Sequence, residues 1–161
     1  MKIGLATNGF NNLTNDEMAQ LCADNKLDCV QLFLCQKDSN YWRYNGRHST
    51  EKLTTAECQR IANAYRSRGI GIPSIGIYTN LIEPNEAERA QNIQHFAEMM
   101  RVANDMGIRI LATECGSVIV PGKGRDLSAS LSEDAYPRLM DSTRKLVDLA
   151  NKHDVILVFE S

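Results

Sequence analysis

The chain has 161 residues, 43% of them hydrophobic, which suits one domain with a buried core and excludes a disordered chain. Its formal net charge of −2 argues against a nucleic-acid binder, because phosphate backbones are bound by a basic face. We therefore expect a small neutral or anionic metabolite as the partner and no nucleic acid.

The cysteines and the amino terminus indicate where in the cell the protein is located. The five cysteines are odd in number and include no CxxC pair, which is typical of reduced thiols in a cytosolic protein. Met1 leads directly into a strand pattern without a basic-then-apolar leader, and no apolar run is long enough to cross a bilayer. We expect a cytoplasmic protein that does not contact a membrane.

Strand and helix patterns alternate along the chain. Strands are predicted at residues 2–8, 27–34, 70–78, 108–114 and 154–160. Helices are predicted to begin at the caps Thr14, Thr54, Asn85 and Ser132 and to end near Asn25, Gly69, Gly107 and His153. Pro73 is unusual within the third strand, because proline cannot donate to a central ladder. The alternation predicts parallel βαβ units with right-handed crossovers.

The last strand carries the clearest functional signal. Its five consecutive apolar residues, 155–159, predict a strand buried on both faces that ends in the carboxylate of Glu160. The fourth strand ends in Glu114 in the same way. Segments that leave helices are short, whereas those that leave strands are long, as in the glycine-punctuated loop at residues 115–131. Function is therefore expected at the carboxyl ends of the strands.

Two architectures fit this pattern: an open doubly wound sheet of five strands, or the first half of a (β/α)8 barrel. The nucleotide-binding form of the open sheet needs several glycines at its first strand-to-helix turn, whereas residues 8–12 contain one. A barrel typically has about 250 residues, so this chain would supply only part of one. A half barrel would leave two apolar sheet edges exposed, which is an aggregation hazard.

Four segments in succession, at residues 78–84, 88–107, 112–117 and 149–161, resemble the xylose isomerase-like TIM-barrel superfamily. That superfamily includes sugar and sugar-phosphate isomerases and epimerases, and the endonuclease IV class of DNA-repair enzymes. The resemblance implies an α/β chain of the (β/α)8 TIM-barrel type with about its first five strands and four helices. Residues 1–161 would then be the amino-terminal portion of one barrel domain.

The resemblance also implies a reaction. The complete protein would be a divalent-metal-dependent isomerase or epimerase that moves a proton next to the carbonyl of a sugar or sugar-like substrate. In that family the glutamate that ends the fifth strand binds the metal and, in epimerases, takes part in proton transfer; here it is Glu160. The metal would be Mn, Mg or Co, with most ligands beyond Ser161, so the chain alone is expected to be inactive. Without the resemblance, Glu160 also fits a strand cap or the partner of an arginine.

Three more candidates for substrate binding lie at the ends of the third and fourth strands. Glu114 either contacts substrate or accepts hydrogen bonds from the backbone amides of Cys115 and Gly116. Asn80 and Tyr78 either hydrogen-bond to sugar hydroxyls or form a turn with a packed tyrosine.

The polar, aromatic loop after the second strand supplies two further candidates. Trp42, together with Tyr41, either covers the C–H face of a sugar or holds its own loop in place. His48 is the only histidine on the expected functional face, whereas the DNA-repair branch uses several. Sugar chemistry is therefore favoured over phosphodiester cleavage.

Two interpretations stay open. The segment Gly122–Arg125 lacks the spacing of a phosphate-binding P-loop, and is either a basic lid for an anionic substrate or a solvated loop.

The competing function is a non-catalytic α/β domain that binds a small molecule or partner and self-associates as a homo-oligomer through its open sheet edges.

Overall fold

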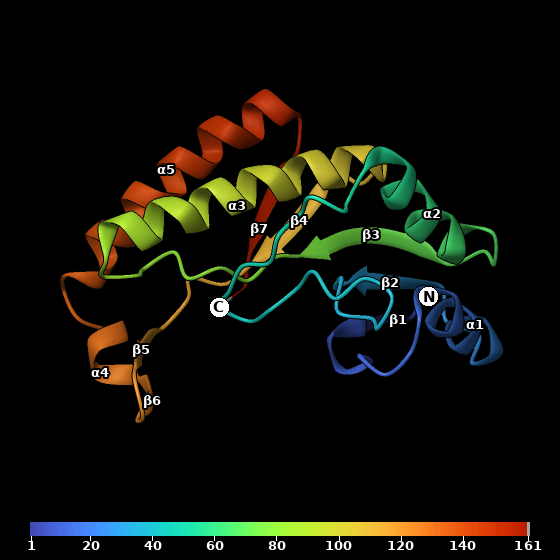
Figure 1. Cartoon of the computed structure of the whole chain (residues 1–161), viewed down its shortest axis with the longest axis horizontal. Coiled ribbons are helices and arrows are strands. Elements are labelled where there is room, and N and C mark those ends of the chain that lie inside the picture. Colours follow the sequence, from blue (N-terminus) through green and yellow to red (C-terminus); the bar gives the residue numbers. More distant parts are fainter. Residues whose placement is uncertain (161) are drawn as a thin grey trace.

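Five parallel strands form one sheet in the order β1-β2-β3-β4-β7 (Figure 1). They are β1 Gly4–Ala6, β2 Cys29–Leu32, β3 Gly71–Gly76, β4 Ile110–Thr113 and β7 Ile156–Phe159. The structure is a computed structural model that describes residues 1–160; Ser161, which ends the last segment of the resemblance, lies outside them. Each neighbouring pair of strands is parallel, which confirms the predicted alternation. Within residues 1–160 no strand joins β1 to β7, so the barrel is not closed.

Four helices connect these strands: α1 Asn15–Asp24, α2 Thr55–Arg66, α3 Glu86–Asp105 and α5 Ala135–His153. Three of the four predicted caps are confirmed, because the side chains of Thr14, Thr54 and Asn85 each accept a hydrogen bond from a first-turn N–H. The prediction for Ser132 is wrong. Its Oγ donates to the carbonyl of Ala129 at 2.8 Å, and α5 begins only after Asp134.

The loop at residues 115–131 is more ordered than its sequence indicates. It contains the antiparallel pair β5 Val118–Val120 and β6 Gly124–Asp126, followed by the short helix α4 Leu127–Ser130. In Figure 1 this group stands apart from the sheet, beyond the carboxyl ends of its strands. It is therefore placed where the sequence predicts function.

The core lies between the helices and one face of the sheet. Val30, Leu32, Ile75 and Leu111 point into it from the strands and are fully buried. The helices contribute large side chains to the same cluster, namely Met18, Ile61, Tyr65, Phe96, Met100 and Leu146. Cys22 and Cys58 are buried there on helix faces as free thiols. This layer fixes the sheet against the helices.

The other face of the sheet, called here the open face, carries small and polar side chains together with the apolar Ile110, Ile156 and Val158. The strand register places Gln31 beside Ser74, and Gly76 beside Ala112. Pro73 is tolerated in the central strand β3 because the β2–β3 register shifts there: Cys29 pairs with Gly71, but Gln31 pairs with Ser74. The extra residue in β3 forms a bulge, where a missing N–H breaks no ladder bond.

The prediction that the last strand is buried on both faces is wrong. Val155 is buried, but Ile156, Val158 and Phe159 are 51%, 42% and 38% exposed. β4 pairs with one side of β7, and within residues 1–160 no strand pairs with its other side. At the opposite edge Ile3, next to β1, is 53% exposed. Both sheet edges are thus open, as expected for part of a barrel.

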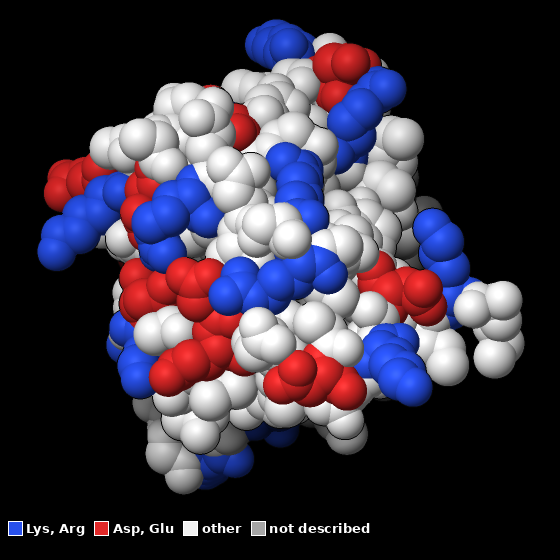
Figure 2. Space-filling view, turned by 90° about the vertical axis from the view of Figure 1, so that its right-hand side faces the viewer, with Lys and Arg blue, Asp and Glu red and all other residues white. Residues whose placement is uncertain are grey.

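The outer surface carries both signs of charge. On the face shown in Figure 2, basic and acidic side chains are interspersed, without a large area of one sign. Several charged side chains of the chain form ion pairs, for example Arg60 with Asp38 and Arg68 with Asp16. Among the helices of residues 1–160, none has the length and apolar character needed to cross a membrane.

Candidate functional site

Three adjacent strands bring Tyr78, Glu114 and Glu160 to one level of the open face. Gly76, Ala112 and Val158 are register partners on β3, β4 and β7. Two residues after these partners come Tyr78, Glu114 and Glu160. Because side chains alternate along a strand, all three lie on the same face as their partners. The backbone N–H of Glu160 donates to Thr113 O at 2.8 Å, which extends the ladder to this level. The grouping of the two glutamates expected from the sequence is therefore present.

Glu160 has a partner from a distant strand. Its Oε1 accepts a hydrogen bond from Gln31 Nε2 at 3.2 Å, although β2 and β7 are separated by two strands. Within residues 1–160 it forms no ion pair, so the alternative of a carboxylate paired with an arginine does not hold here. The side chain is exposed and accessible to a ligand.

Glu114 is held by a tyrosine rather than by backbone amides. Tyr44 Oη donates to Glu114 Oε2 at 2.8 Å, and this hydroxyl in turn accepts a hydrogen bond from Arg125 on β6. Burial, followed by the Glu114 carboxylate, raises the pKa of the Tyr44 phenol. The hydroxyl is therefore protonated at neutral pH and acts as a donor to Glu114.

An aromatic cluster of Phe33, Trp42, Tyr44 and Tyr78 lies beside these carboxylates. The Phe33 and Tyr78 rings stack with centroids 5.3 Å apart, and Trp42 meets Phe33 edge-on at 5.0 Å. Gly76 makes room for this, because a Cβ at that position would lie 2.5 Å from the Phe33 ring. Burial, followed by the nearby carboxylates of Glu160 and Glu114, raises the pKa of Tyr78. Trp42 therefore packs against other rings, while Tyr78 also borders the two glutamates.

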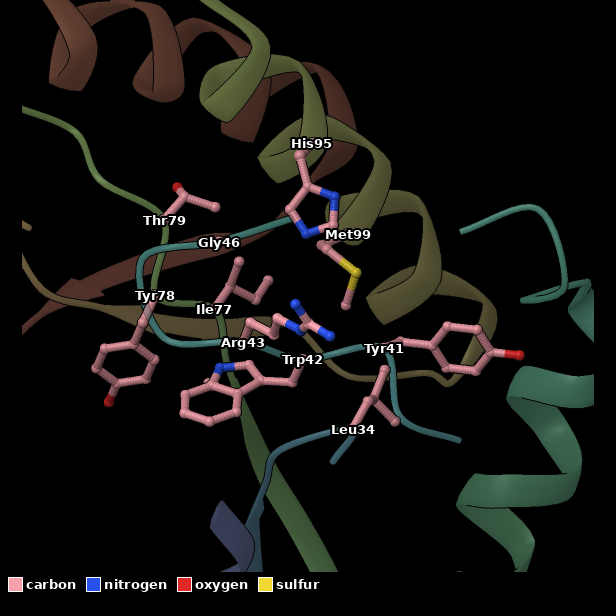
Figure 3. Close-up of a pocket in the computed structure, with 11 residues that line it drawn as sticks. Leu34, Tyr41, Trp42, Arg43, Gly46, Ile77, Tyr78, Thr79, His95 and Met99 are labelled. Atoms are coloured by element: carbon pink, nitrogen blue, oxygen red, sulfur yellow. The ribbon is translucent and has the colours of Figure 1, made fainter. Parts of the chain in front are cut away.

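A small cavity behind this cluster is too small for a sugar. It lies between the loop after β2 and helix α3, with Trp42 and Tyr78 on one side and His95 and Met99 on the other (Figure 3). Its volume is about 10 Å³, which is close to the minimum for one water molecule. The buried Trp42 Nε1 and Thr79 Oγ1 have no hydrogen-bond partner within residues 1–160.

A larger hollow opens at the carboxyl ends of β4 and β7. Its volume of about 550 Å³ is within the range of small-molecule sites. Charged residues in its lining are Glu114, Glu160 and Arg125, and apolar residues include Ile82, Leu127, Leu131, Tyr136 and Leu139. Cys115 also lines it, and burial raises the pKa of that thiol, so it stays protonated. This space, called here the hollow, is the candidate ligand site.

Asn80 is not among the residues that line the hollow, and its side chain holds neighbouring segments together. Its Nδ2 donates to Ser117 O at 2.8 Å and to Glu83 Oε2 at 3.1 Å, and the residue is buried. Both amide hydrogens are thus used to hold the start of the β5–β6 hairpin and the loop before α3. The arrangement matches the alternative in which Asn80 organises a turn, and it leaves no donor for a substrate.

His48 is not brought to the hollow. It lies against α3, where it lines a separate depression with Arg47, His95 and Glu98. The neighbouring Arg47 attaches this part of the loop to α3 through Glu88, Gln91 and Asn92. The structure thus places His48 apart from Tyr78, Glu114 and Glu160.

The carboxylates of Glu160 and Glu114 are the type of oxygen ligand that Mn and Mg prefer. However, residues 1–160 contain no group of three or more His, Cys, Asp or Glu side chains placed to hold a metal ion. The oxygen atoms of these carboxylates are suitable metal ligands, but there are too few of them to complete a site. These residues do not form a complete metal site by themselves.

Sequence reasoning missed two residues of the site, Gln31 and Tyr44, and it did not bring Arg125 of the candidate lid together with Tyr44. Gln31 is a polar residue inside an otherwise apolar strand, which signals a specific role on the open face. Tyr44 and Arg125 lie in long connections far apart in the chain, and no local pattern joins them. The open question about Gly122–Arg125 is answered in part, because Arg125 lines the hollow instead of extending into solvent alone.

Comparisons with known proteins agree with this architecture. The family model described as xylose isomerase-like TIM barrel matches residues 19–161. No curated protein matches the chain. Among solved structures, a D-psicose 3-epimerase from Clostridium cellulolyticum has 12% identity and a TM-score of 0.70, over 98% of this chain and 51% of that chain.

Two other solved structures are similar. The 3-keto-D-glucoside 4-epimerase of E. coli has 13% identity and a TM-score of 0.69, over 99% of this chain and 55% of that chain. A xylose isomerase domain protein from Planctomyces limnophilus has 16% identity and a TM-score of 0.64, over 100% of this chain and 52% of that chain. At these identities the likeness shows the fold. The chain spans about half the length of each solved structure.

Proposed function

Since the chain belongs to the xylose isomerase-like TIM-barrel family, we propose that the complete protein is a sugar isomerase or epimerase. Sugar epimerases among the structural neighbours support this class of reaction. The observation that carries the proposal is the row of Tyr78, Glu114 and Glu160 on the open face, with Glu114 and Glu160 lining one hollow.

The proposed chemistry is proton transfer by Glu160. An exposed carboxylate removes the proton from the carbon next to the substrate carbonyl, and the electron pair moves to the carbonyl oxygen as an enediolate. Protonation of the same carbon on its opposite face gives an epimer. Protonation of the former carbonyl carbon, with the proton of the neighbouring hydroxyl passing to the first oxygen, gives the isomer. Gln31, which donates to Glu160 at 3.2 Å, orients the carboxylate. In this proposal Glu114 and the Tyr78 hydroxyl contact substrate hydroxyls.

A divalent cation, Mn, Mg or Co, belongs to the same proposal as a stabiliser of negative charge on the substrate oxygen. Glu160 would be one of its ligands. Because residues 1–160 do not form a complete metal site, the remaining ligands would come from elsewhere in the complete protein. The 161-residue chain alone should therefore show negligible turnover.

The test compares Glu160→Gln with the control Glu51→Gln in the complete protein, since Glu51 is exposed and lies in another loop. Turnover is measured with a panel of neutral and phosphorylated ketoses and aldoses, and bound Mn by elemental analysis. We expect Glu160→Gln to lower kcat by about 100-fold or more and to reduce Mn content, with Glu51→Gln unchanged. Full turnover by Glu160→Gln would refute the assignment.

A second candidate is self-association of this chain without catalysis. It is favoured by the exposed apolar side chains at the edge strand β7, Ile156 and Val158, and by Ile3 at the other edge. Sedimentation of the 161-residue chain tests it. A dimer that Val158→Lys converts to a monomer supports this candidate, and a monomer at all concentrations excludes it.

A further inference from the structure

Arg125 is the only cationic side chain among the described residues that line the hollow. Its Nη2 donates to the hydroxyl of Tyr44, and its guanidinium lies over the Tyr44 ring, 5.6 Å from the ring centroid. Tyr44 itself donates to Glu114. The neutral phenol therefore stands between Arg125 and the nearest glutamate, and leaves the positive charge of Arg125 without a direct counter-charge.

Most other arginines of this chain have their charge or donors satisfied. Five form ion pairs with carboxylates: Arg47, Arg60, Arg68, Arg101 and Arg109. Three more donate to backbone carbonyls: Arg66, Arg89 and Arg138. Arg125 has no ion pair within residues 1–160, although it lines a space with two glutamates. Its remaining N–H groups are available to a ligand.

The segment that carries Arg125 is held in a defined position. At its base Asn80 bonds to Ser117 O, and Gly116 approaches Asn80 so closely that a Cβ would lie 2.3 Å from its Oδ1. At its end Ser130 Oγ accepts from Val118 N at 2.9 Å. The adjacent Asp126 accepts from Ala129 N at 2.9 Å as the cap of α4, so it is used there and does not neutralise Arg125.

On this evidence, and resting on the proposed function, we propose that Arg125 binds an anionic group of the sugar substrate, a phosphate or a carboxylate. A guanidinium presents its N–H donors in a planar fork that matches both groups. Glu114 and Glu160 repel an anion from the same hollow, so the charge of Arg125 decides whether an anionic sugar is accepted. Tyr44 is a positioning residue, because it fixes the guanidinium through its hydroxyl and ring. Arg125 thus sets the substrate class.

The test is binding, measured by titration calorimetry with the complete protein. The probes are D-fructose, D-fructose 6-phosphate and D-gluconate, which separate a neutral sugar from a phosphate and a carboxylate. The variants are Arg125→Gln and the control Lys123→Gln, which removes one positive charge from the exposed turn of the same hairpin. Arg125 is exposed, so its substitution should leave the melting temperature unchanged.

We expect the wild type and Lys123→Gln to bind at least one anionic probe about 10- to 100-fold more tightly than D-fructose. Arg125→Gln should lose that preference. The anion bound more tightly identifies the group that Arg125 recognises. Equal binding of all three probes by the wild type, or an unchanged preference in Arg125→Gln, would overturn the proposal.

The two proposals fail in different ways. If sugars are converted but Arg125→Gln changes no preference, the anion site is refuted and the proposed function stands. If Arg125→Gln abolishes tight binding of an anionic sugar but no sugar is ever converted, the anion site stands and the proposed function is refuted.

Discussion

Gln31 Nε2 lies 3.2 Å from Glu160 Oε1, although the strands that carry them are separated by β3 and β4. In the strand register Gln31 lies level with Ser74, Ile110 and Ile156, four residues before Glu160. A flat sheet would keep these two side chains far apart. Only a sheet that is curled and tilted as in a barrel brings them together. On the two strands between them Gly76 and Ala112 are register partners, and the Phe33 ring packs over Gly76.

Gln31→Leu removes the donor to Glu160 and keeps a side chain of similar size. Hydrogen bonds to charged groups contribute more than neutral ones, so we expect kcat of the complete protein to fall about tenfold. The free energy of unfolding should change by less than about 0.5 kcal/mol, because the site is partly exposed. Ser74→Ala, beside Gln31 on the open face, is the matched control and should leave kcat unchanged. Wild-type turnover in Gln31→Leu would show that Gln31 does not orient Glu160.

Gly76→Ala should disturb the aromatic cluster. The new Cβ would lie 2.5 Å from the Phe33 ring and 2.9 Å from the Tyr78 ring, and these two rings stack on each other. Such overpacking costs about 1–3 kcal/mol, measurable by urea unfolding. At Gly9 a Cβ would meet nothing within 4 Å, so Gly9→Ala is the control and should stay within about 0.5 kcal/mol of the wild type. Equal stability of the two variants would contradict the packing described.

His95 should make stability depend on pH. Burial lowers its pKa, with Arg47 and His48 acting in the same direction and Glu98 opposing. The unfolded chain then binds more protons than the folded one below about pH 6.5, so stability falls on acidification. One such histidine gives a slope of at most about 1.4 kcal/mol per pH unit. Urea unfolding between pH 7 and 5.5 should show a shallower slope in His95→Gln.

The matched control for this pH dependence is Gln94→Ala, an exposed residue without a titratable group next to His95 on α3. It should retain the wild-type slope. His48, whose pKa is also lowered by burial and then by Arg43, should account for part of the slope that remains in His95→Gln. A slope that is identical in the wild type and His95→Gln would show that His95 does not titrate as described.

Much of the fold was predictable because its signals are local. The cap at Thr14 forms the expected box with Glu17, and each predicted turn from helix to strand contains a residue with positive φ: Lys26, Gly69, Gly107 and Asp154. The position of Glu160 and Glu114 at the ends of parallel strands also follows from local patterns. The family resemblance, carried by the succession of segments, is confirmed over residues 19–161.

The remaining features depend on contacts between distant segments. The apolar run before Glu160 predicts burial, but exposure is decided by whether another element covers β7. Ser132 has the sequence of a cap, yet its hydroxyl bonds to Ala129 because Ser132 directly follows Leu131, the C-cap of α4. Tyr44 reaches Glu114 and Arg125 across 70 and 81 positions of sequence. Residue type alone does not specify such pairs.

The proposal that Glu160 moves the substrate proton is tested by solvent-hydrogen exchange, catalysed by the complete protein in D2O. Its converted sugar is examined by proton NMR for deuterium at the carbon next to the carbonyl. We predict incorporation by the wild type and by Glu51→Gln, and a loss of about 100-fold or more in Glu160→Gln. Incorporation by Glu160→Gln at the wild-type rate would show that another group moves the proton, and would contradict the assignment.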